Sequence, residues 1–229
     1  MEQSPFQPVD QESLPNQVVS SIRHAIQIGV LKPGDRLVEM EIAEQMAISR
    51  APVREALRIL ERDGLVVTIP RKGTFVNELS IEDIKEIYSL RSVLEGYAIK
   101  LAIENAGPDD IRRLNDLFTQ MINAAQKGET EELVERDIEF HRLICELSAH
   151  KRLLEDWARM NAQLRLFLTI KDRMYDDPRE IAETHRPVLE AMRKGDLDQA
   201  EKVIKEHITQ AGELVVARMI QEEEEPAVS

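Results

Sequence analysis

The chain has 229 residues, 42% of them hydrophobic and 32% charged, so it is long enough for one large or two modest domains with packed cores. Thirty Lys and Arg residues against 43 Asp and Glu residues give a net charge of −13, which excludes a protein that covers nucleic acid or anionic membrane with its whole surface. The single cysteine, Cys145, excludes an intramolecular disulfide. The polar start and the lack of a long apolar run disfavour export and membrane insertion, and a cytoplasmic protein is expected.

The N-terminal part of the chain shows the signals of three helices. Apolar residues recur at helical spacing over 14–29 and again over 39–46, and a Pro-Gly turn separates the two segments. A third helix is predicted over 50–63, with Ser49 as its N-cap. This arrangement is typical of a helix-turn-helix.

A hairpin with a basic tip follows the third predicted helix. The segments LVVTI and TFVNEL are short and rich in β-branched residues, and residues 70–73, with the sequence PRKG, separate them. Three helices and a two-stranded hairpin together predict a winged helix-turn-helix domain over residues 1–78.

The remaining residues, 79–229, predict an all-helical domain. Ser80 and Asp83 form a capping-box pattern for a helix that begins at residue 81. Helix breaks are expected at five later places: Gly107–Pro108, Gly128, around His150, Asp177–Pro178 and Gly195. The fold class is therefore mainly α, with a winged helix-turn-helix followed by a bundle of about six helices.

The third predicted helix carries two arginines suited to reading DNA. Arg50 and Arg54 are i, i+4 neighbours and project from one face, as the N-terminal residues of a recognition helix do in a major groove. An arginine fork matches the O6 and N7 atoms of guanine. The alternative is that both arginines only solvate the helix and pair with Glu55 and Glu61.

The hairpin tip and the helix N-cap add further candidate DNA contacts. Arg71, Lys72 and Gly73 suit a wing that lies on a minor groove, because glycine lets the backbone approach closely. Ser49 can offer its hydroxyl to a phosphate. Together with the arginines, these residues favour DNA binding over mere solvation.

The stretch from residue 29 to 76 resembles the N-terminal domain of GntR-family bacterial transcription regulators, most specifically in PGDRLVE, SRAPVREALR and RKGTFV. The helical second half is similar to the FadR-type subgroup, whose effector domain is called FCD. The resemblance covers about residues 14–220. It implies a homodimer on a palindromic operator, with DNA contacts at Arg50, Arg54 and Gly73 and, less directly, at Ser49, Arg71 and Lys72.

Polar side chains interrupt the apolar stripes of three helices in the second half. Asp137 and His141 are i, i+4 neighbours on one helix, so their side chains lie over one spot. His185 and His207 interrupt the stripes of the fifth and sixth predicted helices. An antiparallel hairpin around Gly195 would place these two imidazoles within roughly 3 Å of the same height.

A divalent transition metal would satisfy this buried set of one acid and three imidazoles, and zinc, nickel, manganese and iron all suit such ligands. Many FCD domains carry the same pattern, which the resemblance transfers to Asp137, His141, His185 and His207. The alternative is that ordinary core hydrogen bonds satisfy the histidines. The sequence contains no HExxH motif and no Glu-x-x-His pair, which argues against a catalytic metal.

A permanent cation lies within the apolar stripe of the helix that begins at residue 81. Arg91 occupies this position and requires an anion. Glu95 at i+4 is one candidate, and the carboxylate of a ligand whose other oxygens reach the metal is the second. The resemblance favours the ligand, because FCD regulators commonly sense small organic acids. Arg165 is a weaker candidate for the same role.

These patterns predict a sequence-specific transcription regulator without catalytic activity. We hypothesise that an organic acid binds between Arg91 and the metal and changes the distance between the two recognition helices of a homodimer. Two alternatives stay open. One is a metal-dependent enzyme that acts on a small acid, with Glu183 or Glu206 as a general base, and the other is a protein-binding helical module without metal.

Overall fold

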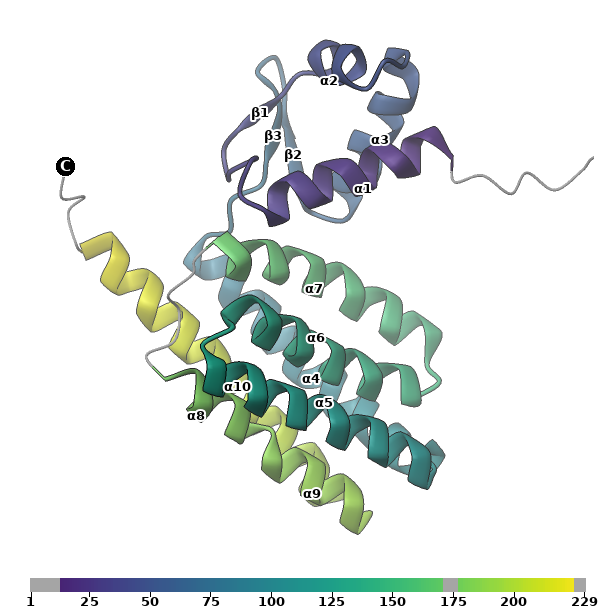
Figure 1. Cartoon of the computed structure of the whole chain (residues 1–229), viewed down its shortest axis with the longest axis vertical. Coiled ribbons are helices and arrows are strands. Elements are labelled where there is room, and N and C mark those ends of the chain that lie inside the picture. Colours follow the sequence, from purple (N-terminus) through teal and green to yellow (C-terminus); the bar gives the residue numbers. More distant parts are fainter. Residues whose placement is uncertain (1–12, 171–176, 225–229) are drawn as a thin grey trace, which may run out of the picture. The chain divides into compact units, whose positions relative to one another are not determined.

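The structure, a computed structural model, describes residues 13–170 and 177–224 (Figure 1). The chain divides into two compact units, of which one ends at Asn77 and the other begins at Glu78. Within the described residues, no helix combines the length and the apolar character that a membrane span requires.

The N-terminal unit is a winged helix-turn-helix, as the sequence predicts. Its elements in chain order are α1 (Leu14–Gln27), β1 (Arg36–Leu37), α2 (Glu39–Gln45), α3 (Arg50–Arg62), β2 (Val66–Ile69) and β3 (Gly73–Val76). Helices α1 and α3 pack against each other through their apolar stripes. Ile22 and Ile26 of α1 and Val53 and Leu60 of α3 are buried in this small core.

The sheet of this unit has three antiparallel strands in the order β1-β3-β2, whereas the sequence predicts only two. The additional strand, β1, pairs with β3 through Arg36 opposite Phe75 and Leu37 opposite Thr74. A strand of two residues is too short to show an alternating pattern, which is why the sequence does not reveal it. The strand brings Arg36 beside the hairpin.

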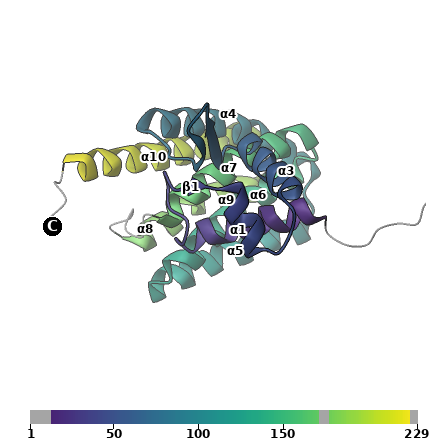
Figure 2. The same ribbon diagram turned by 90° about the horizontal axis from the view of Figure 1, so that it is seen from above.

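The described part of the C-terminal unit consists of seven helices (Figures 1 and 2). They are α4 (Ile81–Asn105), α5 (Pro108–Lys127), α6 (Thr130–Leu147), α7 (Lys151–Ile170), α8 (Pro178–Thr184), α9 (Arg186–Lys194) and α10 (Leu197–Glu224). Helix α4 begins with the predicted capping box, in which Asp83 donates its backbone N–H to the hydroxyl of Ser80 and its carboxylate accepts the backbone N–H of Ser80. Helix α4 packs along α10, and α6 packs against α4, α5 and α7.

The prediction of about six helices is one too low for the described residues, because the expected fifth helix is divided at His185 into α8 and α9. Pro187 explains the division. Its ring nitrogen has no N–H to donate to the carbonyl of Glu183, so the helical hydrogen bonding is interrupted. His185 therefore lies at a junction between two short helices.

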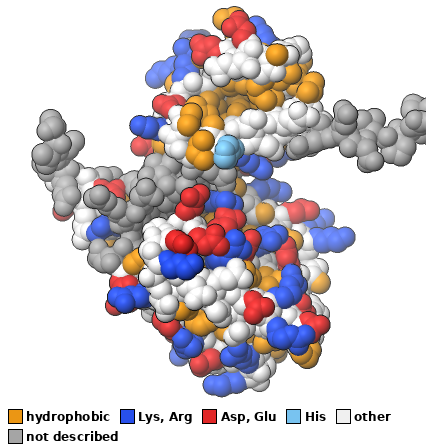
Figure 3. All heavy atoms as spheres, viewed as in Figure 1, with side chains coloured by type: hydrophobic (Ala, Val, Ile, Leu, Met, Phe, Trp, Pro, Cys, Tyr) orange, Lys and Arg blue, Asp and Glu red, His pale blue; other side chains and the backbone are white. Residues whose placement is uncertain are grey.

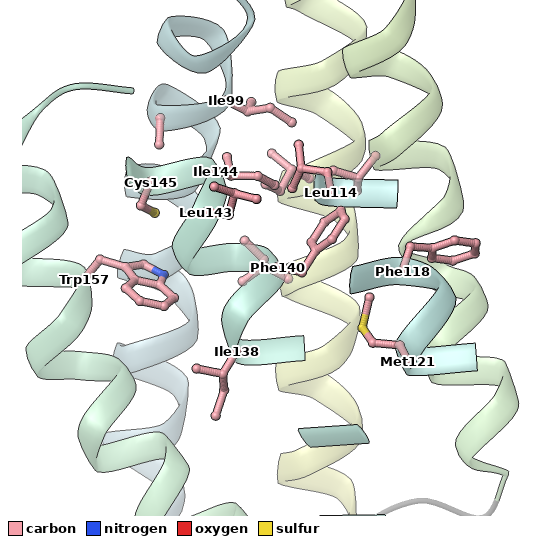
Figure 4. Packing of buried hydrophobic residues seen from close by; sticks show 14 of the residues in the cluster. Ile99, Leu114, Phe118, Met121, Ile138, Phe140, Leu143, Ile144, Cys145 and Trp157 are labelled. Atoms are coloured by element: carbon pink, nitrogen blue, oxygen red, sulfur yellow. The ribbon is translucent and has the colours of Figure 1, made fainter. Parts of the chain in front are cut away.

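Apolar side chains from all seven described helices form one core in this unit. Figure 4 shows Phe140 and Ile144 of α6 among side chains from the neighbouring helices, including Leu114 and Trp157. Acidic and basic side chains intermingle on the face of this unit that Figure 3 shows. Many of them form exposed pairs one helical turn apart, so the excess negative charge of this part of the chain is solvated.

Glycine allows α4 and α10 to approach each other closely. A Cβ atom added at Gly212 of α10 would lie 2.7 Å from both Cβ and Cγ of Tyr88 on α4. Real Cβ contacts do not occur at this distance, and Tyr88 is buried. The position of Tyr88 therefore depends on the absence of a side chain at residue 212.

Replacing Gly212 with Ala is expected to destabilise the protein by about 1–3 kcal/mol, because the added methyl group overpacks the contact with Tyr88. Urea unfolding of the full chain measures the change in the free energy of unfolding. The matched control is Glu213→Ala on the exposed face of the same helix, which should change stability by no more than about 0.5 kcal/mol. A Gly212→Ala protein as stable as the control would contradict this account of the helix contact.

Candidate metal centre and DNA-reading surface

The four side chains that the sequence singles out lie together in the C-terminal unit. Asp137 and His141 come from α6, His185 from the junction of α8 and α9, and His207 from α10. Each offers one ligand atom, and these four atoms lie within 4.8 Å of one another. The three histidines are buried and the aspartate is partly exposed. Residues far apart in the sequence thus form one cluster of metal-type donors.

Two of the distances within this cluster are close to those of neighbouring ligands on one ion. Nε2 of His141 lies 3.2 Å from Nε2 of His207, and Nε2 of His185 lies 2.9 Å from Oδ1 of Asp137. Two ligands bound at about 2.0–2.2 Å to one ion are about 3 Å apart when they occupy neighbouring positions. The His185 Nε2 atom is buried without a hydrogen-bond partner among the described residues, even though the Asp137 oxygen is close. A lone pair that points at a common centre explains both observations.

Hydrogen bonds outside the cluster orient two of the three imidazoles. Nδ1 of His141 lies 2.5 Å from Oε2 of Glu95, and Nδ1 of His185 lies 3.1 Å from the carbonyl oxygen of Ile181. When each Nδ1–H donates to its oxygen, each Nε2 carries a free lone pair that faces the cluster. Such partners are the usual second layer of a histidine metal site.

The carboxylate of Glu95 contacts three polar side chains of this unit. Its carboxylate accepts hydrogen bonds from Nε of Arg91 at 2.9 Å and from Nε1 of Trp157 at 2.7 Å, in addition to the contact with His141. Its side chain is 0% exposed. Burial by itself would raise the pKa of Glu95, but the charges of His141 and Arg91 and the hydrogen bonds outweigh it and lower the pKa to about 2. The carboxylate is therefore ionised.

The charge states of the cluster also suit a cation. Burial opposes the ionisation of Asp137, but interaction with His185 and the other imidazoles holds its pKa well below the usual value. Burial and the neighbouring imidazoles lower the pKa of His207 well below 6.5, so this imidazole is neutral. One carboxylate and neutral imidazole nitrogens are the donor set that zinc, nickel, manganese and iron accept.

A cavity of about 80 Å³ adjoins the cluster. Asp137, His141 and His207 line it, together with Arg91 and Tyr88 of α4. The expected pairing of Arg91 with Glu95 is present through Nε, and the side chain also lines the cavity, so its role in ligand binding stays a prediction. The sequence suggests Glu95 only as a partner of Arg91 and gives no sign of its contacts with Trp157 and His141, which come from other helices.

The structure does not bring Arg165 to this cavity, which corrects the expectation that it helps to bind the ligand. Its guanidinium pairs with Glu135 of α6 and lines a separate, open depression of the surface. Leu164, the preceding residue of α7, faces the cavity instead. Consecutive residues of a helix point about 100° apart, so both side chains cannot face the same space.

In the N-terminal unit, Arg50 and Arg54 project from the start of α3 and are exposed. Both bind Glu39 of α2, Arg50 through one bond of 3.1 Å and Arg54 through two bonds of 3.1 and 3.2 Å. The sequence suggests Glu55 and Glu61 as partners, and Glu39 was missed because it precedes the turn between the helices. The two guanidinium groups are thereby held side by side at the position of a recognition helix.

The other predicted DNA contacts lie at the same end of α3 or on the wing. Ser49 is the N-cap residue of α3, but its hydroxyl makes no capping hydrogen bond. Arg71 and Lys72 form the exposed turn between β2 and β3, and Arg71 has a positive φ of 65°. Gly73 has a φ of 122°, and a Cβ atom there would lie 3.0 Å from Nε of Arg36, a further basic residue of the wing that the sequence analysis did not identify.

A winged helix-turn-helix joined to an all-helical unit is the organisation of a class of bacterial DNA-binding regulators. Residues 14–76 match the family "Bacterial regulatory proteins, gntR family", and residues 86–210 match the FCD domain. The chain belongs to the GntR family of bacterial transcription regulators and carries an FCD domain. The resemblance derived from the sequence motifs is thereby confirmed.

Individual relatives agree with this assignment. The chain is 31% identical over 193 residues to the HTH-type transcriptional regulator YdhC of Bacillus subtilis (strain 168), which covers 83% of this chain and 86% of the relative. It is 34% identical over 161 residues to the HTH-type transcriptional regulator McbR of Escherichia coli (strain K12), over 66% of this chain and 71% of the relative. The solved structure of E. coli McbR/YncC aligns with a TM-score of 0.77 at 28% identity and covers 91% of this chain and 100% of that chain. The protein is a DNA-binding transcription regulator.

The buried imidazole of His207 predicts a pH dependence of the metal-free protein. Because its pKa in the folded state lies below 6.5, the unfolded chain binds the proton first as the pH falls. Stability should therefore decrease below about pH 6.5, by about 1.4 kcal/mol per pH unit. Glu95, with its pKa lowered from 4.5 to about 2, adds a second loss below about pH 4.5.

Urea unfolding between pH 5 and pH 8 in the presence of a chelator measures this slope. His207→Asn should flatten it, whereas His24→Asn on the exposed surface of α1 should keep it. Equal slopes for His207→Asn and the wild type would show that another group causes the loss.

Proposed function

We propose that a small organic acid, bound in the cavity between Arg91 and a metal ion held by the cluster, controls the affinity of this regulator for its operator. The cluster is formed by Asp137, His141, His185 and His207. One observation carries the proposal: the buried His185 Nε2 atom has no hydrogen-bond partner among the described residues, and the other three members of its cluster line a cavity that also contains an arginine. Zinc fits the donor set best, and nickel, manganese and iron also suit it.

Different residues have different roles in the proposed binding of the acid. The guanidinium of Arg91 lines the cavity and offers its terminal nitrogens to a carboxylate, while Glu95 holds the arginine in place through Nε. A divalent ion, when bound, supplies positive charge and open coordination positions for ligand oxygens. Glu95 and the Ile181 carbonyl keep the Nε2 atoms of His141 and His185 directed at the cluster.

The DNA-reading role rests on the first turn of α3 and on the wing. We propose that Arg50 and Arg54 contact base edges in the major groove, that Arg71, Lys72 and Gly73 form the wing contact, and that Ser49 contacts a phosphate. A homodimer on a palindromic operator follows from the need to place two recognition helices about one helical turn apart. Such spacing makes operator affinity sensitive to the arrangement of the two copies.

The cavity also offers a route by which the acid changes DNA binding. Its walls come from α4, α6, α7, α8 and α10, and α4 follows directly on the winged unit in the chain. An acid that binds one arrangement of these helices more tightly than another shifts the population toward it, typically by a coupling of about 1–3 kcal/mol.

The geometry argues against the two alternative functions. Glu183 pairs with Arg186 and Glu206 pairs with Lys202, and all four side chains are exposed, so neither glutamate is placed as a general base at the cluster. A purely structural packing of the histidines would satisfy their nitrogen atoms with hydrogen bonds, whereas Nε2 of His185 makes none among the described residues and has only the Asp137 oxygen nearby, at 2.9 Å.

Protein purified without a His tag is expected to contain about one equivalent of divalent transition metal per chain. His207→Ala should lose most of this metal, because one of four ligands is removed, and chelation should lower the melting temperature of the wild type. Elemental analysis and thermal unfolding measure the two effects, and His24→Ala is the control that should keep the metal. Less than half an equivalent in the wild type, with melting that does not respond to chelator, would contradict the metal site.

Replacing Arg54 with Ala should weaken binding to a selected operator by about 1–3 kcal/mol and relax the preference for one base, because a bidentate contact to guanine is lost. Binding measured on the operator and on random duplex at fixed salt separates this loss from a general loss of phosphate contacts. Arg62→Ala, at the far end of α3, is the matched control. Unchanged discrimination in Arg54→Ala would remove this residue from the proposed base contacts.

A further inference from the structure

We infer that the cavity beside the His/Asp cluster takes a short-chain monocarboxylate and discriminates against di- and tricarboxylates. The inference rests on the function proposed above, since it specifies the class of acid for the same cavity. Three observations support it: the net charge of the buried groups, the volume of the cavity, and two polar side chains of its lining, Arg91 and Asn161, that have unused hydrogen-bonding groups.

The buried charges leave room for one negative charge. Arg91 is 4% exposed and Glu95 is 0% exposed, and their ion pair at 2.9 Å already balances the arginine. Asp137 contributes one negative charge next to three imidazoles, so a divalent ion at the cluster leaves a single positive charge in excess. Among the described residues that line the cavity, Arg91 is the only Lys or Arg. A second carboxylate held within the cavity would therefore be buried without a cation, which is strongly unfavourable.

The volume of the cavity limits the number of ligand atoms and so also favours a small acid. Its volume is about 80 Å³, and a site for one water molecule needs roughly 10–15 Å³ on this scale. The space therefore admits roughly five to eight non-hydrogen atoms, counting the ion itself. Propionate and butyrate fit this limit, whereas citrate does not.

The walls of the cavity match the two ends of such an acid. Among the described residues, the terminal guanidinium nitrogens of Arg91 donate to no protein acceptor, so they are available to a carboxylate. The side chain of Asn161 is 7% exposed and has no hydrogen-bond partner within the described part of the chain, which provides a second polar contact. The rest of the lining is largely aliphatic and suits a short hydrocarbon tail: Ile138, Leu164, Ile181, Ile208 and Leu214.

The test measures the binding of defined acids to the full-length, zinc-loaded protein by calorimetry and thermal shift at constant ionic strength. Propionate and butyrate should bind, and malonate, succinate and citrate should bind at least about a hundredfold more weakly, because each additional carboxylate is buried without a cation. Metal content is measured in every sample, so that loss of the ion through chelation by an acid is not mistaken for binding.

Two variants change the charge of the cavity in opposite directions. Glu95→Gln removes one buried negative charge and should raise the affinity for succinate relative to propionate at least about tenfold. Asn161→Asp is nearly isosteric, breaks no hydrogen bond of the described structure, and should weaken propionate binding at least about tenfold, because it supplies the missing negative charge itself. Glu104→Gln, on the exposed part of α4, is the matched control and should leave both affinities unchanged.

The outcomes separate this inference from the function on which it rests. If none of the five acids binds or stabilises the zinc-loaded protein, the proposed acid sensing at this cavity is wrong. If succinate or citrate binds as tightly as propionate, acid sensing stands and the monocarboxylate inference is overturned. Should Glu95→Gln fail to fold or to retain zinc, Asn161→Asp decides alone, and unchanged propionate affinity in that variant refutes the charge argument.

Discussion

The buried carboxylate of Glu95 is the group on which the arrangement of the helical unit around its His/Asp cluster depends. It joins three helices, because it accepts hydrogen bonds from Arg91 on its own helix, from Trp157 on α7 and from His141 on α6. Removing one partner of a buried ion pair typically costs about 3–5 kcal/mol, since the other charge is left uncompensated. Glu95 therefore stabilises the bundle and also sets the direction in which the arginine and the imidazole point.

This arrangement places two kinds of recognition in one small space. In the proposed function the imidazoles bind a cation and Arg91 binds an anion, and Glu95 contacts a member of each set. Helix α4 carries both Arg91 and Glu95 and follows the hairpin of the winged unit in the chain. Its close packing on α10, through Gly212 against Tyr88, links two of the helices that line the cavity. Under the proposed function, a ligand in the cavity would contact the first helix after the winged unit in the chain.

Much of the fold could be predicted, because the relevant signals are local. Helical spacing, the capping box at Ser80 and the glycines at the helix ends mark most boundaries. The features that the sequence did not predict arise from very short segments, from single residues or from contacts between distant segments. Strand β1 has two residues and exists only through its pairing with β3, and the break at His185 follows from a single residue, Pro187, within an otherwise helical pattern. The partly exposed pairing of Arg165 with Glu135 depends on the rotation of α7 about its axis, which the sequence does not fix.

The sequence by itself determined the family, the two-part organisation and the four side chains of the cluster, because family motifs and polar residues in apolar stripes are properties of single segments. Only the tertiary structure decided which groups satisfy one another: Glu39 with the two recognition arginines, and Glu95 with Arg91, Trp157 and His141. The size and charge of the cavity were decided in the same way. These properties depend on distances between residues of different helices, and a linear pattern contains no information on the relative rotation and height of helices that fixes those distances.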